Sequence, residues 1–416
     1  MSFIVPADAK SWIEAEPQSD FPIQNLPFGI AEIGGMFELA TRVGETVVLL
    51  GPLARAGLIT WDEERLVGDK PTMLQLPAEE LSNLRMELFA QLSEGKSFDG
   101  LLKAQSLLPA AAVQMAVPKV TAFIDFYSGI NHASNVGRMF RPDQPPLLPN
   151  YRHLPVGYNG RASSVIISET SVIRPKGQTK GADDPSPVFG PTKELDFELE
   201  LGFFLGEGTE LGETVPITEA ESKMIGFVLV NDWSSRDVQR WEYQPLGPFL
   251  AKSFATSISP WVVTIDALEP FRKKGPAQDP AVLTHLQQHG PEHFDIKLEV
   301  LLKTAKSTKP QLISRTNAME LYWSAAQQLA HQASNGTPLE AGDLYASGTI
   351  SGTEPDSFGS MLELTWRGTK PIIIEETGEE RRFLEDGDQL TIQGHCQGEG
   401  FRVGFGEVTA EIMPAS

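Results

Sequence analysis

The chain has 416 residues, of which 41% are hydrophobic, enough for substantial cores in two or three domains. Its 34 basic and 55 acidic residues give a formal net charge of −21, a field that repels nucleic acid and anionic membranes and excludes both as partners. The single cysteine, Cys396, excludes an internal disulfide, and neither a secretory signal nor an apolar run near the roughly 20 residues that span a bilayer is present, so we expect a soluble cytoplasmic protein.

The first 118 residues predict a small N-terminal domain. Residues 1 to about 75 alternate short β-like runs, such as 45–50, with Gly and Pro, which is typical of a small barrel. From Glu79 the apolar period becomes helical, and Gly95 marks its end. The leucines at helical spacing are Leu81, Leu84, Leu88 and Leu92. We therefore expect domain 1–118 to combine a barrel-like module with a helical segment.

Residues 119–416 predict a larger domain, mainly β, with few helices. Its β-like runs are 164–167, 195–203, 227–230, 261–265, 294–302 and 361–366. One helix is expected after Asp232, and another from about Asn317 to Gln332. Asn317 and Glu320 have the spacing of a capping box, and Gly336 follows the predicted end.

The run 195–203 alternates strictly between apolar and other residues. This pattern places Asp196, Glu198 and Glu200 on one face of a strand. Three neighbouring acids repel one another unless water or a cation neutralises them. Both a solvated sheet face and a cation site are therefore consistent with the pattern.

The segment 231–243 follows a β-like run and has helical spacing. The residues that would form one stripe are Asp232, Arg236, Gln239 and Tyr243. The simplest interpretation is a surface helix with an Asp232–Arg236 salt bridge. The flanking Trp233 and Trp241 instead indicate that the segment is largely buried.

A third group of polar residues lies between Asp125 and residue 161. Asp125 and His132 can act as a metal ligand and a base, and Tyr127 and Arg141 can donate hydrogen bonds to an anionic substrate. A lone histidine is more often structural. The remaining histidines lack paired metal-ligand spacing, which argues against zinc.

Two glycine-rich segments carry little information by themselves. Residues 348–353 lead to Glu363 but match no phosphate-binding loop. Residues 394–406 precede no predicted helix, so they indicate hairpin turns rather than a dinucleotide-binding motif.

Taken together, these segments resemble the fumarylacetoacetate hydrolase family. The similar segments are 1–4, 19–27, 125–127 with His132, 155–164, 195–200, 231–234, 239 with 241–250, 252–254, 347–352 and 358–364. The resemblance implies an SH3-like N-terminal domain, a larger mixed β-sandwich or roll catalytic domain, and a homodimer. It also implies hydrolysis of the carbon–carbon bond of 4-fumarylacetoacetate, a diketo acid from tyrosine and phenylalanine breakdown, to fumarate and acetoacetate.

The resemblance further implies roles for individual residues. The ligands of a Ca²⁺ or Mg²⁺ ion would be Asp125, Glu198, Glu200 and Asp232, with a second cation near the backbone of Lys252 and Thr256. His132 would be the base, paired with Glu363, and Arg236, Gln239 and Lys252 would donate to the reacting carbonyl. The substrate contacts would be Tyr127, Arg141, Tyr158, Gln239, Tyr243 and Thr349. Asp196 is not a ligand in this pattern, and residues 129–131 are less polar than the family pattern before the base.

The chemistry of a β-diketone agrees with these roles. Hydroxide must add to one carbonyl and a carbanion must leave, so an activated water, oxyanion donors and a Lewis acid are needed. A related acylpyruvate hydrolase or oxaloacetate decarboxylase would use the same acidic cage on a smaller substrate, although the extended N-terminal module argues against both. A non-catalytic cation-binding or assembly protein is the alternative of a different class.

Overall fold

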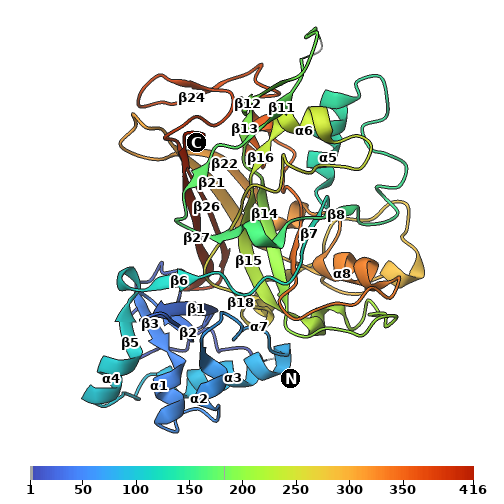
Figure 1. Cartoon of the computed structure of the whole chain (residues 1–416). Coiled ribbons are helices and arrows are strands. Elements are labelled where there is room, and N and C mark those ends of the chain that lie inside the picture. Colours follow the sequence, from blue (N-terminus) through green and yellow to red (C-terminus); the bar gives the residue numbers. More distant parts are fainter. Residues whose placement is uncertain (1–2, 182) are drawn as a thin grey trace.

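The computed structural model describes residues 3–181 and 183–416 (Figure 1). Met1 and Ser2, which open the first family-like segment, and Ala182 lie outside the described residues. Within the part that is described, no helix combines the length and apolar character required to cross a membrane.

The N-terminal part contains an antiparallel sheet with strand order β5-β3-β2-β1-β6, and β4 pairs with β2. Its strands are β1 (Phe28–Ile33), β2 (Met36–Val43), β3 (Thr46–Leu49), β4 (Val67–Gly68), β5 (Leu107–Pro109) and β6 (Gln114–Ala116). Its helices are α1 (Leu50–Arg55), α2 (Glu63–Leu66), α3 (Ala78–Leu92) and α4 (Gly100–Ser106). The predicted helix is confirmed as α3, whose four periodic leucines are at most 1% exposed.

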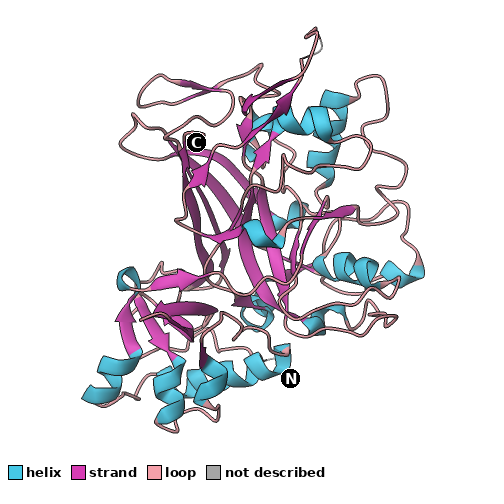
Figure 2. Ribbon diagram, viewed as in Figure 1, coloured by secondary structure: helices cyan, strands magenta, loops and turns pink. Residues whose placement is uncertain are grey.

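The larger part is built on two sheets. The eight-stranded sheet has the order β8-β7-β23-β14-β15-β17-β9, with β18 paired to β15. Its strands are β7 (Phe123–Phe126), β8 (Gly157–Asn159), β9 (Val165–Ile167), β14 (Leu199–Leu205), β15 (Met224–Asp232), β17 (Thr256–Ile258), β18 (Val263–Thr264) and β23 (Leu344–Ala346). The five-stranded sheet is β10 (Val172–Ile173), β27 (Arg402–Met413), β26 (Gln389–Gln397), β21 (Lys297–Lys303) and β22 (Gln311–Asn317). The predicted mainly β fold is confirmed, and Figure 2 shows the strands in the middle of the molecule with most helices around them.

Shorter elements complete the chain. The two-stranded pairs are β11 (Lys176–Thr179) with β12 (Val188–Pro191), β13 (Leu195–Asp196) with β16 (Ser234–Ser235), β19 (Arg272–Lys273) with β20 (His293–Phe294), and β24 (Ile372–Ile373) with β25 (Glu380–Arg381). The α-helices are α5 (Ile130–Phe140), α6 (Arg236–Glu242), α7 (Ile265–Leu268), α8 (Ala325–Ala333) and α9 (Met361–Leu364). The glycine-rich segment 394–406 joins β26 to β27 as an antiparallel hairpin, as predicted.

Strand β14 is buried along its whole length because the central sheet is covered on both faces. Phe203 belongs to the core shared with Leu298 of the five-stranded sheet. The adjacent Phe204 belongs to the core that contains Leu84 of α3. The strand therefore has a nearly continuous apolar sequence, as expected for strands without a solvent face.

Two predicted elements are wrong. The helix expected from Asn317 begins only at Ala325, where Ser324 and Gln327 form the capping box; Asn317 instead ends β22 and caps a single 3₁₀ turn. The strand expected at 361–366 is helix α9, because the Ser360 and Asp196 side chains accept its first backbone N–H groups. These acceptors are tertiary or capping contacts that the short apolar alternation does not reveal.

Other expectations need smaller corrections. The run 195–203 is interrupted at 197–198, between β13 and β14. Helix α5 was not predicted, because its buried positions include His132, Asn135 and Gly137 rather than an apolar stripe. Trp233 is fully buried as expected, but Trp241 is 44% exposed.

Candidate active site

Four carboxylates from distant segments meet near the ends of three strands of the eight-stranded sheet. Asp125 lies on β7, Glu200 on β14 and Asp232 at the end of β15, while Glu198 directly precedes β14. Each offers an oxygen, and these oxygens all lie within 4.8 Å of one another. All four side chains are buried, at 0–5% exposure. The antiparallel pairing of Leu199 with Asn231 is what brings Glu198 and Glu200 beside Asp232.

Neighbouring groups satisfy part of this cluster. Lys252 Nζ contacts Glu198 and lies 2.7 Å from Asp232 Oδ2, and the Thr256 hydroxyl donates to Asp232 Oδ1 at 2.6 Å. The Tyr158 hydroxyl donates to Asp232 Oδ2 at 3.3 Å.

The carboxylates of Asp125 and Glu200, on the other side of the cluster, receive fewer hydrogen bonds. The Gly348 N–H donates to Glu200 Oε2 at 3.1 Å. Asp125 Oδ1 and Glu200 Oε1 are buried and have no hydrogen-bond partner among the described residues. Unpaired buried carboxylate oxygens are costly, and an all-oxygen donor set suits a hard divalent cation such as Ca²⁺ or Mg²⁺. The residues present therefore fit the cation that the acidic pattern suggested, and the solvated-face interpretation is wrong because the cluster is buried.

The protonation of the cluster depends on its few cations. Burial raises the pKa of Asp125, Glu200 and Asp232, and repulsion among the acids adds to the effect on Asp125 and Glu200. Burial also acts to raise the pKa of Glu198, but Lys252 and Arg236 outweigh it and lower that pKa. A divalent cation would complete the neutralisation that these two side chains begin.

His132 and Glu363 form a buried pair. His132 lies in the first turn of α5 and Glu363 on α9, and Nδ1 of His132 is 2.6 Å from Glu363 Oε2. Asn135 Nδ2 donates to Glu363 Oε1, and the hydroxyls of Ser351 and Ser360 donate to Oε2, each at 2.9 Å. Burial acts to raise the pKa of Glu363, but His132 and these hydrogen bonds outweigh it and lower that pKa. An ionised Glu363 accepts a hydrogen bond from Nδ1–H of His132, which leaves the unprotonated Nε2 able to accept a proton.

Arg236 is held by two buried acids rather than by Asp232. Its Nε donates to Asp196 Oδ2 at 2.8 Å and its Nη2 lies 2.7 Å from Glu198 Oε1. The expected Asp232–Arg236 stripe and salt bridge are wrong because Asp232 lies on β15, before the helix begins at Arg236. The helical spacing holds for Arg236, Gln239 and Tyr243 on or next to α6, and Arg236 Nη1 donates to Gln239 Oε1 at 3.2 Å.

Most of the expected site residues line one cavity of about 490 Å³. Those on its wall are Asp125, Tyr127, His132, Arg141, Tyr158, Glu198, Arg236, Gln239, Tyr243, Lys252 and Thr349. Glu200, Asp232, Thr256 and Glu363 are not part of that wall. Glu200, Asp232 and Glu363 contact it through Gly348, Lys252 and His132 respectively, and Thr256 contacts Asp232. Among the described residues, no hydrogen-bond partner is found for Arg141 Nε or the Thr349 hydroxyl, which leaves both able to bind a ligand.

Sequence reasoning missed the residues that hold the His132–Glu363 pair and the one that, together with Glu198, holds Arg236. Asn135, Ser351 and Ser360 carried no recognisable motif, although Ser360 stands three residues before Glu363 at N-cap spacing. Asp196 was grouped with Glu198 and Glu200. It leaves that face because the strand breaks after it, and it contacts Arg236 instead.

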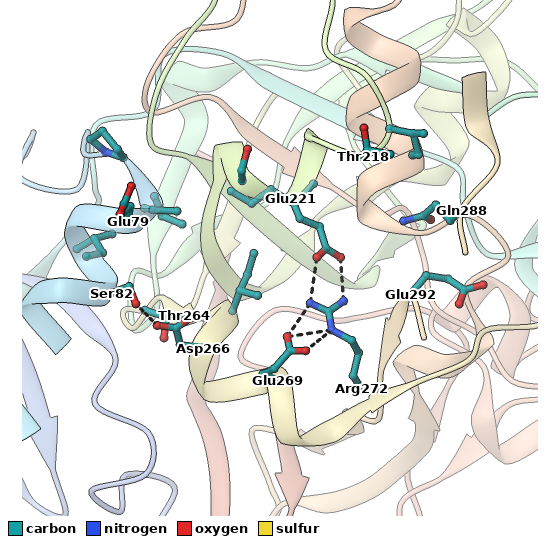
Figure 3. Close-up of a pocket in the computed structure, with 18 of the residues that line it drawn as sticks. Glu79, Ser82, Thr218, Glu221, Thr264, Asp266, Glu269, Arg272, Gln288 and Glu292 are labelled. Carbon is teal, nitrogen blue, oxygen red and sulfur yellow. Dashed lines mark hydrogen bonds and ion pairs between the residues drawn. The ribbon is translucent and has the colours of Figure 1, made fainter. Parts of the chain in front are cut away.

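A larger cleft of about 990 Å³ lies between α3 and the larger part of the chain (Figure 3). Arg272 is the one Arg or Lys among the described residues that line it. Figure 3 shows its guanidinium between Glu221 and Glu269, with nitrogen–oxygen distances of 2.9–3.0 Å to Glu221. Because this cation is paired and several further acids line the cleft, it suits an anionic substrate less well than the smaller cavity.

Comparisons with known proteins agree with the geometry. The family described as fumarylacetoacetate (FAA) hydrolase C-terminal matches residues 121–413. Fumarylacetoacetase of Rattus norvegicus is 45% identical, and that of Homo sapiens is 43% identical; each alignment covers 97% of this chain and 99% of the relative. Fumarylacetoacetase of Dictyostelium discoideum is 43% identical over 98% of both chains.

Solved structures share the fold at low identity. Fumarylacetoacetate hydrolase from Exiguobacterium antarcticum superposes with a TM-score of 0.52 at 16% identity, covering 93% of this chain and 99% of that one. Maleylpyruvate hydrolase from Sphingobium sp. SYK-6 gives 0.50 at 15% identity, covering 93% and 100%. At full-length identities above 40% to the curated relatives, the resemblance seen in the sequence is confirmed: the chain belongs to the fumarylacetoacetase family.

Proposed function

We propose that this protein hydrolyses 4-fumarylacetoacetate to fumarate and acetoacetate, the last step of tyrosine and phenylalanine catabolism. One observation carries the proposal: the His132–Glu363 pair and the four-carboxylate cluster meet at the same cavity. The full-length similarity to curated fumarylacetoacetases supports the choice of substrate.

The acidic cluster is proposed to hold one Ca²⁺ or Mg²⁺ ion. Asp125, Glu198, Glu200 and Asp232 would be its ligands, and the two unpaired oxygens of Asp125 and Glu200 support this assignment. When bound, the ion would supply Lewis-acid stabilisation of negative charge on the diketone oxygens. A second cation at the backbone of Lys252 and Thr256 stays a prediction.

His132 is proposed to begin the reaction as a general base. With Nδ1 directed at Glu363, Nε2 takes a proton from water, and the hydroxide adds to one carbonyl of the diketone. Glu363 orients the ring and stabilises the imidazolium that forms. Its extra hydrogen bonds keep the carboxylate fixed through this change of charge.

Arg236, Gln239 and Lys252 are proposed to stabilise the oxyanion that results. A well-placed donor of this kind contributes roughly 3–4 kcal/mol in other enzymes. Collapse of the tetrahedral adduct breaks the carbon–carbon bond, and its electron pair leaves on the acetoacetate carbanion, whose carbon then takes the proton held by His132. The other product forms with a new carboxylic acid group, which loses its proton to solvent to give fumarate, so atoms and charge balance.

The substrate's carboxylates and carbonyls need further donors on the cavity wall. Those proposed are Tyr127, Arg141, Tyr158, Tyr243 and Thr349, with Gln239 shared between substrate binding and the reacting carbonyl. The unpartnered Arg141 Nε and Thr349 hydroxyl support this role.

We also propose a two-domain homodimer in the cytosol, divided as residues 1–118 and 119–416. The two domains share one core, since Leu84 of α3 belongs to the same cluster as Phe204 of the central sheet.

Leu246, Phe249 and Leu250, in one loop beside the cavity, are 96%, 68% and 52% exposed, and such a patch supports association with a second copy. The single, buried cysteine supports a reducing compartment.

The test is the fall in ultraviolet absorbance as purified enzyme consumes fumarylacetoacetate, with acylpyruvates assayed in parallel. Turnover of fumarylacetoacetate at least ~100-fold faster than that of acylpyruvates, as kcat/KM, supports the proposal. Preference for acylpyruvates would assign the site to a related hydrolase, and no turnover of either would favour a non-catalytic cation-binding protein.

A further inference from the structure

Asp196 lies behind the cavity wall and contacts two separate parts of the catalytic machinery. It is fully buried and does not line the cavity. Its Oδ2 accepts from Arg236 Nε at 2.8 Å and from the Leu362 N–H at 3.0 Å. Its Oδ1 accepts from the N–H groups of Met361 at 2.6 Å and Phe197 at 2.8 Å.

These contacts link the helix that carries Glu363 to Arg236, two parts of the site with different proposed roles in the reaction. Met361 and Leu362 form the first turn of α9, the helix that carries Glu363 and so orients His132. Arg236 begins α6 and is a proposed oxyanion donor. One carboxylate thus fixes the distance between the general base system and the oxyanion donor.

We propose that Asp196 is a positioning residue that couples Arg236 to the helix of Glu363. The inference rests on the proposed hydrolysis, which defines what Arg236 and Glu363 do. Both carboxylate oxygens accept two hydrogen bonds, and all four donors are N–H groups. An amide offers one acceptor oxygen and directs an NH₂ group at donors, so Asp196→Asn must lose either the contact with Arg236 or one with α9.

The test is steady-state kinetics of Asp196→Asn with fumarylacetoacetate. We expect kcat to fall at least ~10-fold while KM stays within ~3-fold, because Asp196 does not contact substrate. The bound-cation content should equal that of wild type. A double-mutant cycle with Arg236→Lys should be non-additive: the loss in the double variant should be at least ~5-fold smaller than the product of the single losses.

Asp388 provides a matched control. It is also fully buried and accepts from Arg381 Nε at 2.9 Å and from a backbone N–H, that of Glu385, at 2.9 Å, but neither Asp388 nor Arg381 lines the cavity. Asp388→Asn should therefore lower thermal stability without lowering kcat of the folded enzyme. An equal loss of kcat in both variants would overturn the positioning role.

Asp196→Glu serves if Asp196→Asn gives no folded protein, since it keeps the charge but displaces the oxygens by one methylene. Wild-type kcat in a folded Asp196 variant, or additive effects in the cycle, overturns the inference. Failure of both variants to fold while Asp388→Asn folds also overturns it, because Asp196 would then serve folding. An inactive wild-type enzyme overturns the proposed function and this inference together, whereas an active wild type with an equally active Asp196→Asn overturns this inference alone.

Discussion

Glu363 Oε2 lies 2.6 Å from Nδ1 of His132, although the two residues are 231 positions apart in the chain. The contact depends on two short helices, α5 and α9, neither of which the sequence pattern predicted. Asn135, Ser351 and Ser360 hold the carboxylate from other directions. The ring of His132 is therefore fixed before any substrate enters.

His132→Gln should remove the proposed base. Gln fills a similar volume and can still contact Glu363, but it cannot take a proton from water, so turnover of fumarylacetoacetate should fall by about 10²–10⁴-fold. His153→Gln, at an exposed histidine outside the cavity wall, is the control and should retain wild-type turnover. Unchanged activity in folded, cation-loaded His132→Gln would reject the role.

Exhaustive chelation should abolish turnover and lower the melting temperature. Without a cation, the Asp125, Glu198, Glu200 and Asp232 carboxylates repel one another in a buried site. Adding back Ca²⁺ or Mg²⁺, monitored by differential scanning calorimetry and elemental analysis, should restore both properties. Full activity in a sample verified to be free of cation would contradict the assignment.

Glu200→Gln should weaken cation binding by at least ~10-fold, because it replaces an ionised ligand by a neutral one. Isothermal titration of the cation-free protein measures the change. Glu399→Gln, which alters an exposed acid, should leave the affinity unchanged. Equal affinities for the three proteins would place the ion elsewhere.

Leu84→Ala should destabilise the whole protein. Leu84 is fully buried in the core that α3 shares with the central sheet, so its truncation should cost about 2–5 kcal/mol of unfolding free energy. Met86 lies on the same helix but is 47% exposed, and Met86→Ala should cost far less. Denaturant unfolding checks this, and a separate early transition confined to the N-terminal part would contradict the shared core.

His293 should contribute a pH-dependent stability. Burial lowers its pKa from 6.5 to about 4, against the opposing effect of the hydrogen bond to the Leu321 carbonyl. Between these values the unfolded chain binds more protons than the folded one, so stability rises with pH across this window. The contribution is complete above pH 6.5 and is lost as pH falls to about 4, amounting to about 3 kcal/mol.

His293→Gln should remove that dependence. Gln keeps a donor for the Leu321 carbonyl but does not titrate, so the difference in unfolding free energy between variant and wild type should change with pH across this window. His289→Gln, at an exposed histidine, is the control variant and should have an unfolding free energy close to that of wild type. A pH-independent difference for His293→Gln would show that His293 protonates equally in both states.

Local sequence patterns predicted the features that depend on residues close together in the chain, such as a helix or the side chains on one face of a strand. The leucine period located α3, and the strict alternation at 195–203 correctly placed Glu198 and Glu200 together. Asp196 broke the same rule because an interruption in the strand turned it toward Arg236.

Local sequence patterns could not predict the contacts between segments that are distant in the chain. Asp125 reaches the cluster through the pairing of β7 with β23 and of β23 with β14, which no local period encodes. The residue pattern offered Asp125 as a metal ligand and the resemblance grouped it with the other three acids, whereas neither assigned a role to Ser351 or Ser360. Helix α9 was mistaken for a strand because the acceptor for two of its N–H groups, Asp196, is 165 residues away.

Strand β14 has no face in contact with water, and it carries Glu200 between two cores. Its backing on one side is supplied by the N-terminal residues around Leu84. Inherited or engineered substitutions in that distant region would therefore lower activity, because they weaken the packing behind a strand that carries a proposed cation ligand. A lower fraction of cation-bound protein would then be the first detectable effect of a substitution in a segment that does not contact the substrate.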